Sequence, residues 1–191
     1  MYCMFFQDIT SGDAQKELTK VFRDCCETTS SDSSPNIALV VCSSAVPSLD
    51  FTSLPTTIIG KMFGFKDAKP SFYFTKGQSP KQVDYDGQLA QFNAARDSGI
   101  VNHVVLVSSM AGTQKDHFLN KNMGNMVLWK RKAEIKLVQS GLSYTILHPG
   151  GLLPHVGTGH NESSRGGKRA LVVGLDDELL KRTDRYICHT S

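Results

Sequence analysis

Two side chains in the middle of the sequence have the chemistry to contact a polar ligand. Ser109 follows the apolar segment 104–107, and Lys132 lies further along in a segment with helical character. A serine hydroxyl can hydrogen-bond a carbonyl oxygen, and an ammonium group on a four-carbon stem can donate several hydrogen bonds to a diol. The alternatives are a serine that caps its turn and a lysine that is solvated on a helix surface. Ser109 and Lys132 are therefore candidate catalytic residues if the fold brings them together.

The segments around these two residues predict a strand, a helix and a second strand. Residues 104–107 are apolar at every position, as in a parallel strand that is covered on both faces. A helix is predicted over 125–140, ending before Gly141, where a helix terminus needs left-handed backbone geometry. The next strand is predicted over 144–147. Because ligands of open α/β sheets bind at the carboxyl ends of the strands, the site is predicted at that edge.

Three motifs in this region occur in a specific order and at a specific spacing: Val-Ser-Ser, Lys-Ala-Glu and Ser-Gly-Leu-Ser-Tyr-Thr-Ile-Leu-His-Pro-Gly-Gly-Leu. Together they resemble the atypical short-chain dehydrogenase/reductases, the branch with an extended-type, NAD-dependent epimerase/dehydratase-like Rossmann fold. The resemblance implies an α/β fold with a three-layer, mainly parallel sheet and NADP or NAD as cofactor. It covers residues 1–182 as one partial NAD(P)-binding domain, with 183–191 as a divergent tail.

The resemblance also implies a set of residues that bind the cofactor. Asp8 and Ile9 resemble the end of a strand that meets the adenine, and a strand over 37–42 leads into a cofactor-side loop. Glycines after the strand at 144–147 would let a flat ring approach the backbone, although an ordinary Pro-Gly turn explains them equally well. The predicted cofactor-binding residues are Asp8, Ile9, Ser43, Ser44, Ala45, Lys132, Pro149, Gly150 and Gly151.

Other elements complete the predicted fold. Helices are expected over 13–26 and 82–98, and strands at Phe5-Phe6 and over 171–173. Residues 43–80 contain four prolines that break any long element, and so long a connection is expected to form a wall of the site.

The sequence lacks a segment that a complete family member would have. The family opens with a strand, a Gly-x-x-Gly-x-x-Gly turn and a helix whose amides hold the pyrophosphate. This sequence contains no such turn. We therefore expect a sheet that lacks its first two strands and the glycine-rich turn, truncated at both ends. Weak cofactor binding and self-association through an exposed sheet edge would follow.

The catalytic tyrosine of the family is also missing. In active members it lies four residues before the helix lysine, on the same helix face, and donates a proton to the substrate oxygen. Counting back four residues from Lys132 gives Leu128, and a leucine cannot donate a proton. This departure predicts weak or absent catalysis.

Composition excludes several other classes of function. The net charge of +3 is too small and dispersed to indicate a nucleic-acid partner. No apolar run is long enough to span a membrane, and the first residues do not resemble a signal peptide. Five cysteines without a Cys-x-x-Cys pair favour a reducing compartment, so a cytoplasmic protein is expected, or an organellar one if a targeting segment is missing. His155 and His160 lie on a glycine-rich loop without a third ligand, and no metal site is predicted.

Three functional hypotheses remain open. The first is an NAD(P)-binding oxidoreductase with weakened or lost activity, whose substrate would be a small carbonyl or quinone. The second is a non-enzymatic module that senses or binds the dinucleotide, which Leu128 favours. The third is a non-functional fragment of a longer parent protein, which the missing phosphate turn favours.

Overall fold

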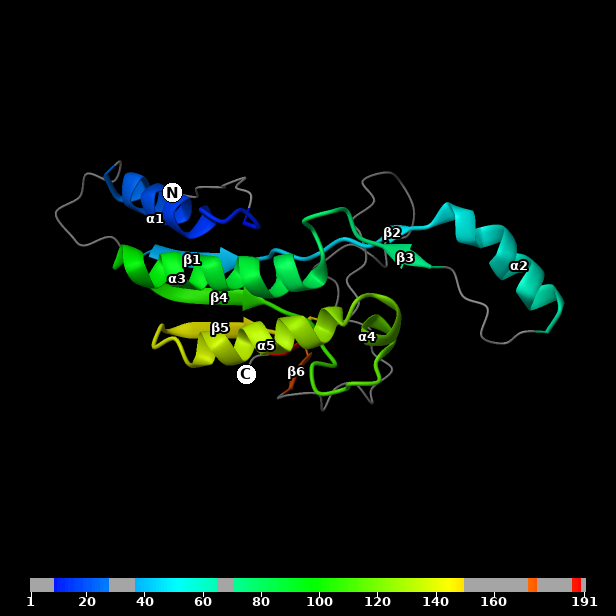
Figure 1. The fold of residues 1–191 in the computed structure, drawn as a ribbon. Coiled ribbons are helices and arrows are strands. Elements are labelled where there is room, and N and C mark those ends of the chain that lie inside the picture. The colour runs from blue at the N-terminus through cyan, green and yellow to red at the C-terminus, as the bar shows by residue number, and fades with distance from the viewer. Residues whose placement is uncertain (1–8, 28–36, 65–70, 150–171, 175–186, 190–191) are drawn as a thin grey trace, which may run out of the picture.

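The computed structural model describes residues 9–27, 37–64, 71–149, 172–174 and 187–189. The elements follow the order α1 (Ala14–Glu27), β1 (Ile37–Val41), β2 (Ser48–Leu49), η1 (Phe51–Ser53), α2 (Leu54–Met62), β3 (Phe72–Tyr73), η2 (Lys81–Gly87), α3 (Gln88–Ser98), β4 (Val101–Val107), α4 (Phe118–Asn122), α5 (Met126–Val138), β5 (Tyr144–Leu147), β6 (Val172–Gly174) and β7 (Ile187–His189). Figure 1 shows their arrangement.

A parallel sheet forms the centre of the fold. Its strand order is β1-β4-β5, and both pairings are parallel, with Leu39 opposite Val104 and Val104 opposite Tyr144. Because the strands are parallel, the loops after all three leave at one edge. The predicted α/β fold with a mainly parallel, Rossmann-like sheet is confirmed.

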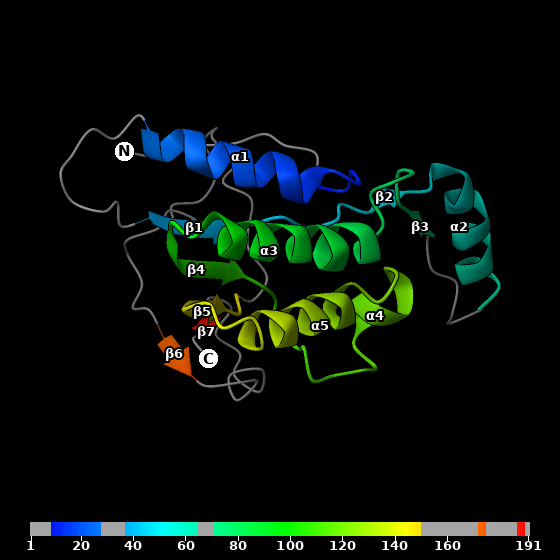
Figure 2. The ribbon, with the colours of Figure 1, turned by 60° about the vertical axis from the view of Figure 1, so that its left-hand side comes forward.

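Three long helices pack on one face of this sheet. They lie side by side in the order α1, α3, α5 (Figure 2). One core cluster joins all three helices to the three strands of the sheet. Its buried members are Leu18, Phe22, Val41, Phe92, Ala94, Ala95, Val101, Val104, Leu106, Ala133, Leu137 and Ile146. Burial of these side chains drives the docking of the helices.

The helices predicted from the sequence are present within a residue or two of their predicted bounds. The first prediction, 13–26, corresponds to α1, and the prediction over 125–140 corresponds to α5. The predicted helix over 82–98 is two elements, the π-helical η2 and α3. Gly141 adopts φ +79° after α5, as the sequence predicts.

An arm, of which residues 46–64 and 71–73 are described, follows the loop after β1 and extends beyond the sheet (Figures 1 and 2). Its two short strands, β2 and β3, pair antiparallel, with Ser48 opposite Tyr73. They carry η1 and α2, with a proline in the first turn of α2. The sequence predicted that prolines break any long element here, and the described elements are all short, although their presence was not predicted. Pro47 directly precedes β2, and Pro55 lies in the first turn of α2. The helix α4 was also not predicted.

The remaining described strands form a separate pair. The predicted strand over 171–173 is β6, which pairs parallel with β7. This β7 lies inside the segment predicted as a divergent tail. The predicted strand at Phe5-Phe6 lies outside the described residues. No helix within the described ranges is long and apolar enough to cross a membrane.

Candidate functional site at the carboxyl end of the sheet

Loops from all three strands of the main sheet meet at its carboxyl edge. The loop after β4 is fastened to β5, because Ser108 N donates to Leu147 O at 2.8 Å and Met110 N donates to Pro149 O at 3.2 Å. Helix α5 runs past these ends and directs two side chains, Lys130 and Glu134, into the same region. They are four residues apart and therefore share one helix face.

Lys130 connects helix α5 to the loop after β1. Its side chain is buried, and Nζ lies 2.7 Å from Oδ1 of Asp84 and donates to the carbonyl oxygen of Ser43 at 3.3 Å. The same Asp84 carboxylate accepts from the backbone N of Ala45, at 3.3 Å. One ion pair therefore holds together η2, α5 and the loop Ser43–Ala45.

The burial of Asp84 affects its protonation. Its side chain is fully buried, and this desolvation raises its pKa above the ordinary value. Attraction to the Lys130 ammonium, together with hydrogen bonds from Lys130, Ala45 and Ser44, offsets only part of that rise. The carboxylate thus depends on its lysine partner to remain ionised.

Two buried polar atoms beside this ion pair have no hydrogen-bond partner in the described part of the chain. They are Ser43 Oγ and Gln88 Oε1. The Gln88 amide nitrogen donates to Ser43 O at 3.2 Å, which fixes its orientation. Buried polar atoms are normally satisfied by protein, water or ligand. The loop after β1 therefore has unused hydrogen-bonding capacity at the edge where ligands of such sheets bind.

Glu134 connects α5 to the ends of β4 and β5. Its Oε1 accepts a hydrogen bond from the Ser108 hydroxyl and lies 3.0 Å from His148 Nε2, while its Oε2 lies 2.7 Å from Arg131 Nη1. Burial alone would raise the pKa of Glu134, but the hydrogen bonds from His148, Ser108 and Arg131 outweigh it and lower that pKa. The ionised carboxylate is a structural centre of this edge.

The structure puts Lys132 on the outer side of α5. It is exposed, and its Nζ lies 4.0 Å from the centroid of the Trp129 ring, a cation–π geometry. Two residues along a helix correspond to a rotation of about 200°, so Lys132 and Lys130 point to nearly opposite sides. The geometry predicted for Lys132, facing the cofactor loop, is found at Lys130 instead.

The other predicted site residues have different surroundings. The Ser109 hydroxyl is half-buried and donates to the Met110 carbonyl oxygen at 3.2 Å, a local contact. Ile9 packs against both core clusters and lies against Gly87, where any Cβ would come within 3.0 Å of it. Ser44 is exposed and Ala45 is buried. Asp8, Gly150 and Gly151 lie outside the described residues.

Sequence reasoning missed the residues with the most extensive polar contacts. These are Asp84, Lys130, Glu134 and His148. A signal was present, because Lys130 and Glu134 are spaced four apart in the helix that follows the serine strand. Lys132, chosen from the Lys-Ala-Glu motif, lies on the opposite side of the helix from Lys130.

Neither lysine has a proton donor four residues before it. That position is Leu128 for Lys132 and Met126 for Lys130, and the Met126 side chain is buried against Ala45 and Val83. The expected lack of the family tyrosine therefore holds for both choices of lysine.

The loop that leaves the site contains a residue in an unfavourable backbone conformation. Ala111 is buried and has φ 65°, in the left-handed region that non-glycine residues rarely adopt. Such a conformation costs about 1–3 kcal/mol and persists where the surroundings require it.

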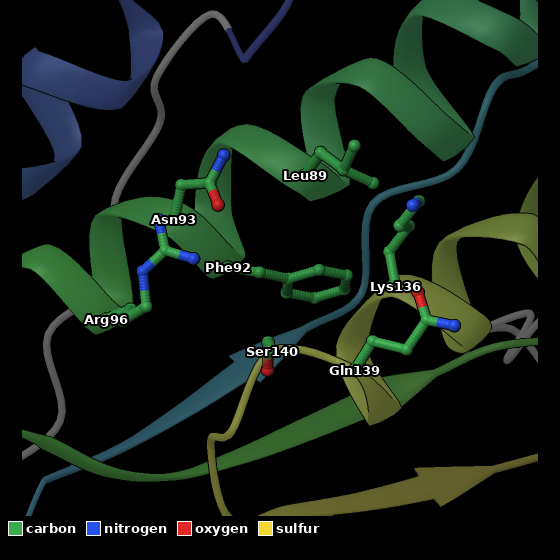
Figure 3. A pocket seen from close by; sticks show the side chains of 7 residues that line it. All are labelled: Leu89, Phe92, Asn93, Arg96, Lys136, Gln139 and Ser140. Atoms are coloured by element: carbon green, nitrogen blue, oxygen red, sulfur yellow. The ribbon is translucent and has the colours of Figure 1, made fainter.

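A groove of about 250 Å³ lies between α3 and α5, lined by Leu89, Phe92, Asn93, Arg96, Lys136, Gln139 and Ser140 (Figure 3). Arg96 and Lys136 belong to the last turns of their helices, where a basic residue is favoured by the helix dipole. The groove lies near the carboxyl ends of these helices, away from the carboxyl edge of the sheet. No group of three or more metal-ligating side chains occurs within the described ranges.

The fold and the polar edge of the sheet define an α/β protein of the dinucleotide-binding kind. The NAD(P)H-binding family matches residues 69–171, which include η2, α5, β4 and β5. The chain therefore belongs to the NAD(P)H-binding family, in agreement with the resemblance to the atypical short-chain dehydrogenase/reductases.

Several proteins with sequence similarity support this assignment. Sanguinarine reductase of Eschscholzia californica is 40% identical over 159 residues, 78% of this chain and 55% of that protein. An uncharacterized chloroplastic protein of Arabidopsis thaliana is 42% identical over 151 residues, 78% of this chain and 41% of that protein. The chloroplastic protein TIC 62 of the same plant is 43% identical over 77 residues, 38% of this chain and 12% of that protein. The chain spans about half the length of the first two relatives.

Proposed function

We propose that this chain binds a nicotinamide dinucleotide at the carboxyl edge of the β1-β4-β5 sheet and is an oxidoreductase-like protein with weak or no turnover. The observation that carries the proposal is Lys130, a buried ammonium group at the loop Ser43–Ala45. The membership of the NAD(P)H-binding family supports the class of ligand.

The local chemistry fits a hydroxyl-rich ligand such as the ribose of NADP or NAD. Lys130 has three N–H donors, of which two are directed to Asp84 and Ser43. The unpartnered oxygens of Ser43 and Gln88 can accept hydrogen bonds from ribose hydroxyls. Lys130 in this role replaces Lys132, whose ammonium group makes a cation–π contact with Trp129.

Turnover requires a proton donor as well as the hydride that the bound dinucleotide supplies. The apolar Met126 and Leu128 occupy the two positions where the family tyrosine would stand. The hydroxyl of Ser109, the other candidate catalytic residue, donates to the Met110 carbonyl oxygen, which is a local contact. A serine hydroxyl has no lowered pKa of its own, so a relay through Ser109 and a water molecule would be slow.

The apolar residues at these two helix positions favour a second candidate function, a dinucleotide-binding module without turnover. If turnover does occur, the name of one relative, sanguinarine reductase, supports a small reducible organic molecule as substrate. A carbonyl or quinone fits that description. Relatives that are named chloroplastic support an organelle as the alternative to the cytoplasm.

The test uses Trp129, the single tryptophan of the sequence. NADPH and NADH are titrated against its fluorescence, with calorimetry as a second measurement. Lys130→Met combined with Asp84→Asn removes the ammonium group without leaving a buried carboxylate alone, and Lys132→Met is the matched control on the opposite helix face. Loss of binding in the Lys130 variant with binding kept in Lys132→Met supports the proposal. The reverse pattern would restore Lys132 as the cofactor lysine, and equal binding by both variants would exclude this site.

A further inference from the structure

The arm, residues 46–64 and 71–73, carries most of the large apolar side chains that are exposed in the described part of the chain. Of eleven such side chains, seven lie on the arm. Five of the seven lie on η1, α2 and the residue that ends α2. They are Phe51, Ile58, Ile59, Met62 and Phe63, with exposed fractions of 73, 59, 52, 82 and 77%. We refer to these five residues as the arm stripe.

Helix α2 exposes its apolar face, whereas an ordinary surface helix buries that face and exposes its polar one. Ile58, Ile59, Met62 and Phe63 follow the spacing that puts side chains on one helix face. A surface helix normally buries such a face, yet the buried residue of α2 is Thr57, whose hydroxyl donates to Ser53 O at 2.7 Å. The polar residue is inside and the apolar face is outside. The arm stripe thus has the composition of an interface.

The charges on the arm limit what can cover this stripe. In its described residues the arm has one acidic side chain, Asp50, and one basic side chain, Lys61. Asp50 is engaged locally, since its Oδ1 accepts from Thr52 N at 3.0 Å and its Oδ2 accepts from Ser71 Oγ at 3.0 Å. A helix that lies on an anionic lipid surface would need a basic polar face, which α2 lacks. A nearly neutral apolar stripe can instead pack on an identical stripe without repulsion between like charges.

The area of the stripe is sufficient for such a pairing. The two phenylalanines each offer about 150–250 Å² when fully exposed and the three aliphatic side chains offer less, so the arm stripe offers on the order of 600 Å² per chain. A two-fold symmetric contact would bury about 1,200 Å² in total, just above the roughly 1,000 Å² that a specific interface requires. Helix α2 projects away from the sheet (Figure 1), and the five side chains of the stripe are each more than half exposed.

We infer that the arm stripe is a homodimer interface, which packs on the same stripe of a second copy of this chain. The pairing uses α2 and η1, and it is separate from the edge of the sheet and from the dinucleotide site. An area near the lower limit for specific interfaces is typical of transient contacts, so we expect monomer and dimer to exchange in solution.

Analytical ultracentrifugation over a range of protein concentrations tests the inference. Ile58→Ser combined with Met62→Ser should weaken dimerisation at least about 100-fold, since both residues lie one helix turn apart on the exposed face of α2. The matched control is Ile135→Ser with Val138→Ser, two residues of α5 that are 46 and 50% exposed. It should dimerise like the unchanged chain. Circular dichroism verifies that both variants keep their helices.

Three results would overturn the inference. The first is an unchanged chain that stays monomeric at the highest concentration, and the second is a dimer that the arm variant does not weaken. The third is that the unchanged chain floats with phosphatidylcholine vesicles and the arm variant does not. The arm stripe would then bind a lipid surface instead of a second chain.

Discussion

Lys130 Nζ and Asp84 Oδ1 lie 2.7 Å apart, with 7% and 0% of their side chains exposed. The pair joins η2 to α5 beneath the loop after β1. Burying two charges carries a large desolvation cost, and only their mutual attraction and further hydrogen bonds offset it. The pair should therefore contribute more to the specific placing of the loop than to the free energy of unfolding.

A double-mutant cycle on this pair should be strongly non-additive. Asp84→Leu or Lys130→Met alone should lower the free energy of unfolding by about 3–5 kcal/mol, since each leaves a buried charge without its partner. The double variant should lose much less than the sum of the two. Denaturant unfolding measures all three. The exposed pair Lys121–Asp116, with atoms 3.0 Å apart, is the control and should contribute less than about 1 kcal/mol. Additive losses at Asp84 and Lys130 would contradict the coupling.

The dependence of stability on pH should change when Glu134 is replaced. The pKa of Glu134 is lowered in the folded state, so the unfolded chain binds more protons as the pH falls. Its stabilising contribution is complete above the ordinary value of 4.5 and is lost as the pH falls through the folded-state pKa. Glu134→Gln should reduce the free energy of unfolding at pH 7 and flatten its decline in acid. Chemical denaturation at a series of pH values measures this, and parallel curves for both proteins would count against it.

The sequence predicted the central sheet because the apolar pattern and the helix ends are local signals. Val104 to Val107 read as a covered parallel strand, and Gly141 marked the end of α5. The strand pattern and the helix end both depend on residues that are neighbours in the chain, so they can be recognised in the sequence itself. The parallel pairing of β4 with β5 followed from the intervening helix.

The candidate site was predicted less well because it depends on rotation about the helix axis. Two residues along α5 correspond to a rotation of about 200°, so Lys130 and Lys132 point to nearly opposite sides of the helix. Lys130 and Asp84 lie far apart in the sequence, and no local sequence pattern predicts their contact. The arm was missed for a related reason, since its short strands are stabilised by pairing with each other and not by a long apolar run.

Dinucleotide affinity should be low in this chain. The sequence contains no Gly-x-x-Gly-x-x-Gly turn, whose amides would hold the pyrophosphate, so the remaining contacts involve mainly the ribose end. Calorimetric titration with NADPH and NADH should give a dissociation constant weaker than micromolar. ADP-ribose serves as a comparison, because it contains the pyrophosphate but lacks nicotinamide. Micromolar or tighter binding would show that other amides, such as those of the loop Ser43–Ala45, hold the phosphates.

Turnover distinguishes an enzyme from a binding module. We expect little or no oxidation of NADPH by this chain in the presence of quinones and small carbonyls, because no phenol lies one helix turn before either lysine. Met126→Tyr would put a phenol four residues before the buried Lys130, whereas Leu128→Tyr would put it before the exposed Lys132. If Lys130 faces the ribose, only Met126→Tyr should gain activity. The expected increase in turnover rate is about 10²- to 10⁴-fold, the usual contribution of general acid catalysis.

The control for this experiment is each tyrosine variant combined with Lys130→Met and Asp84→Asn. Activity gained in Met126→Tyr should disappear in that combination. The stability of Met126→Tyr must be measured alongside, since Met126 is buried and a larger side chain can strain the core. Robust turnover by the unmodified chain, abolished by Lys130→Met with Asp84→Asn, would show that another group donates the proton and that the chain is an enzyme. A gain in Leu128→Tyr alone would instead assign the cofactor contact to Lys132.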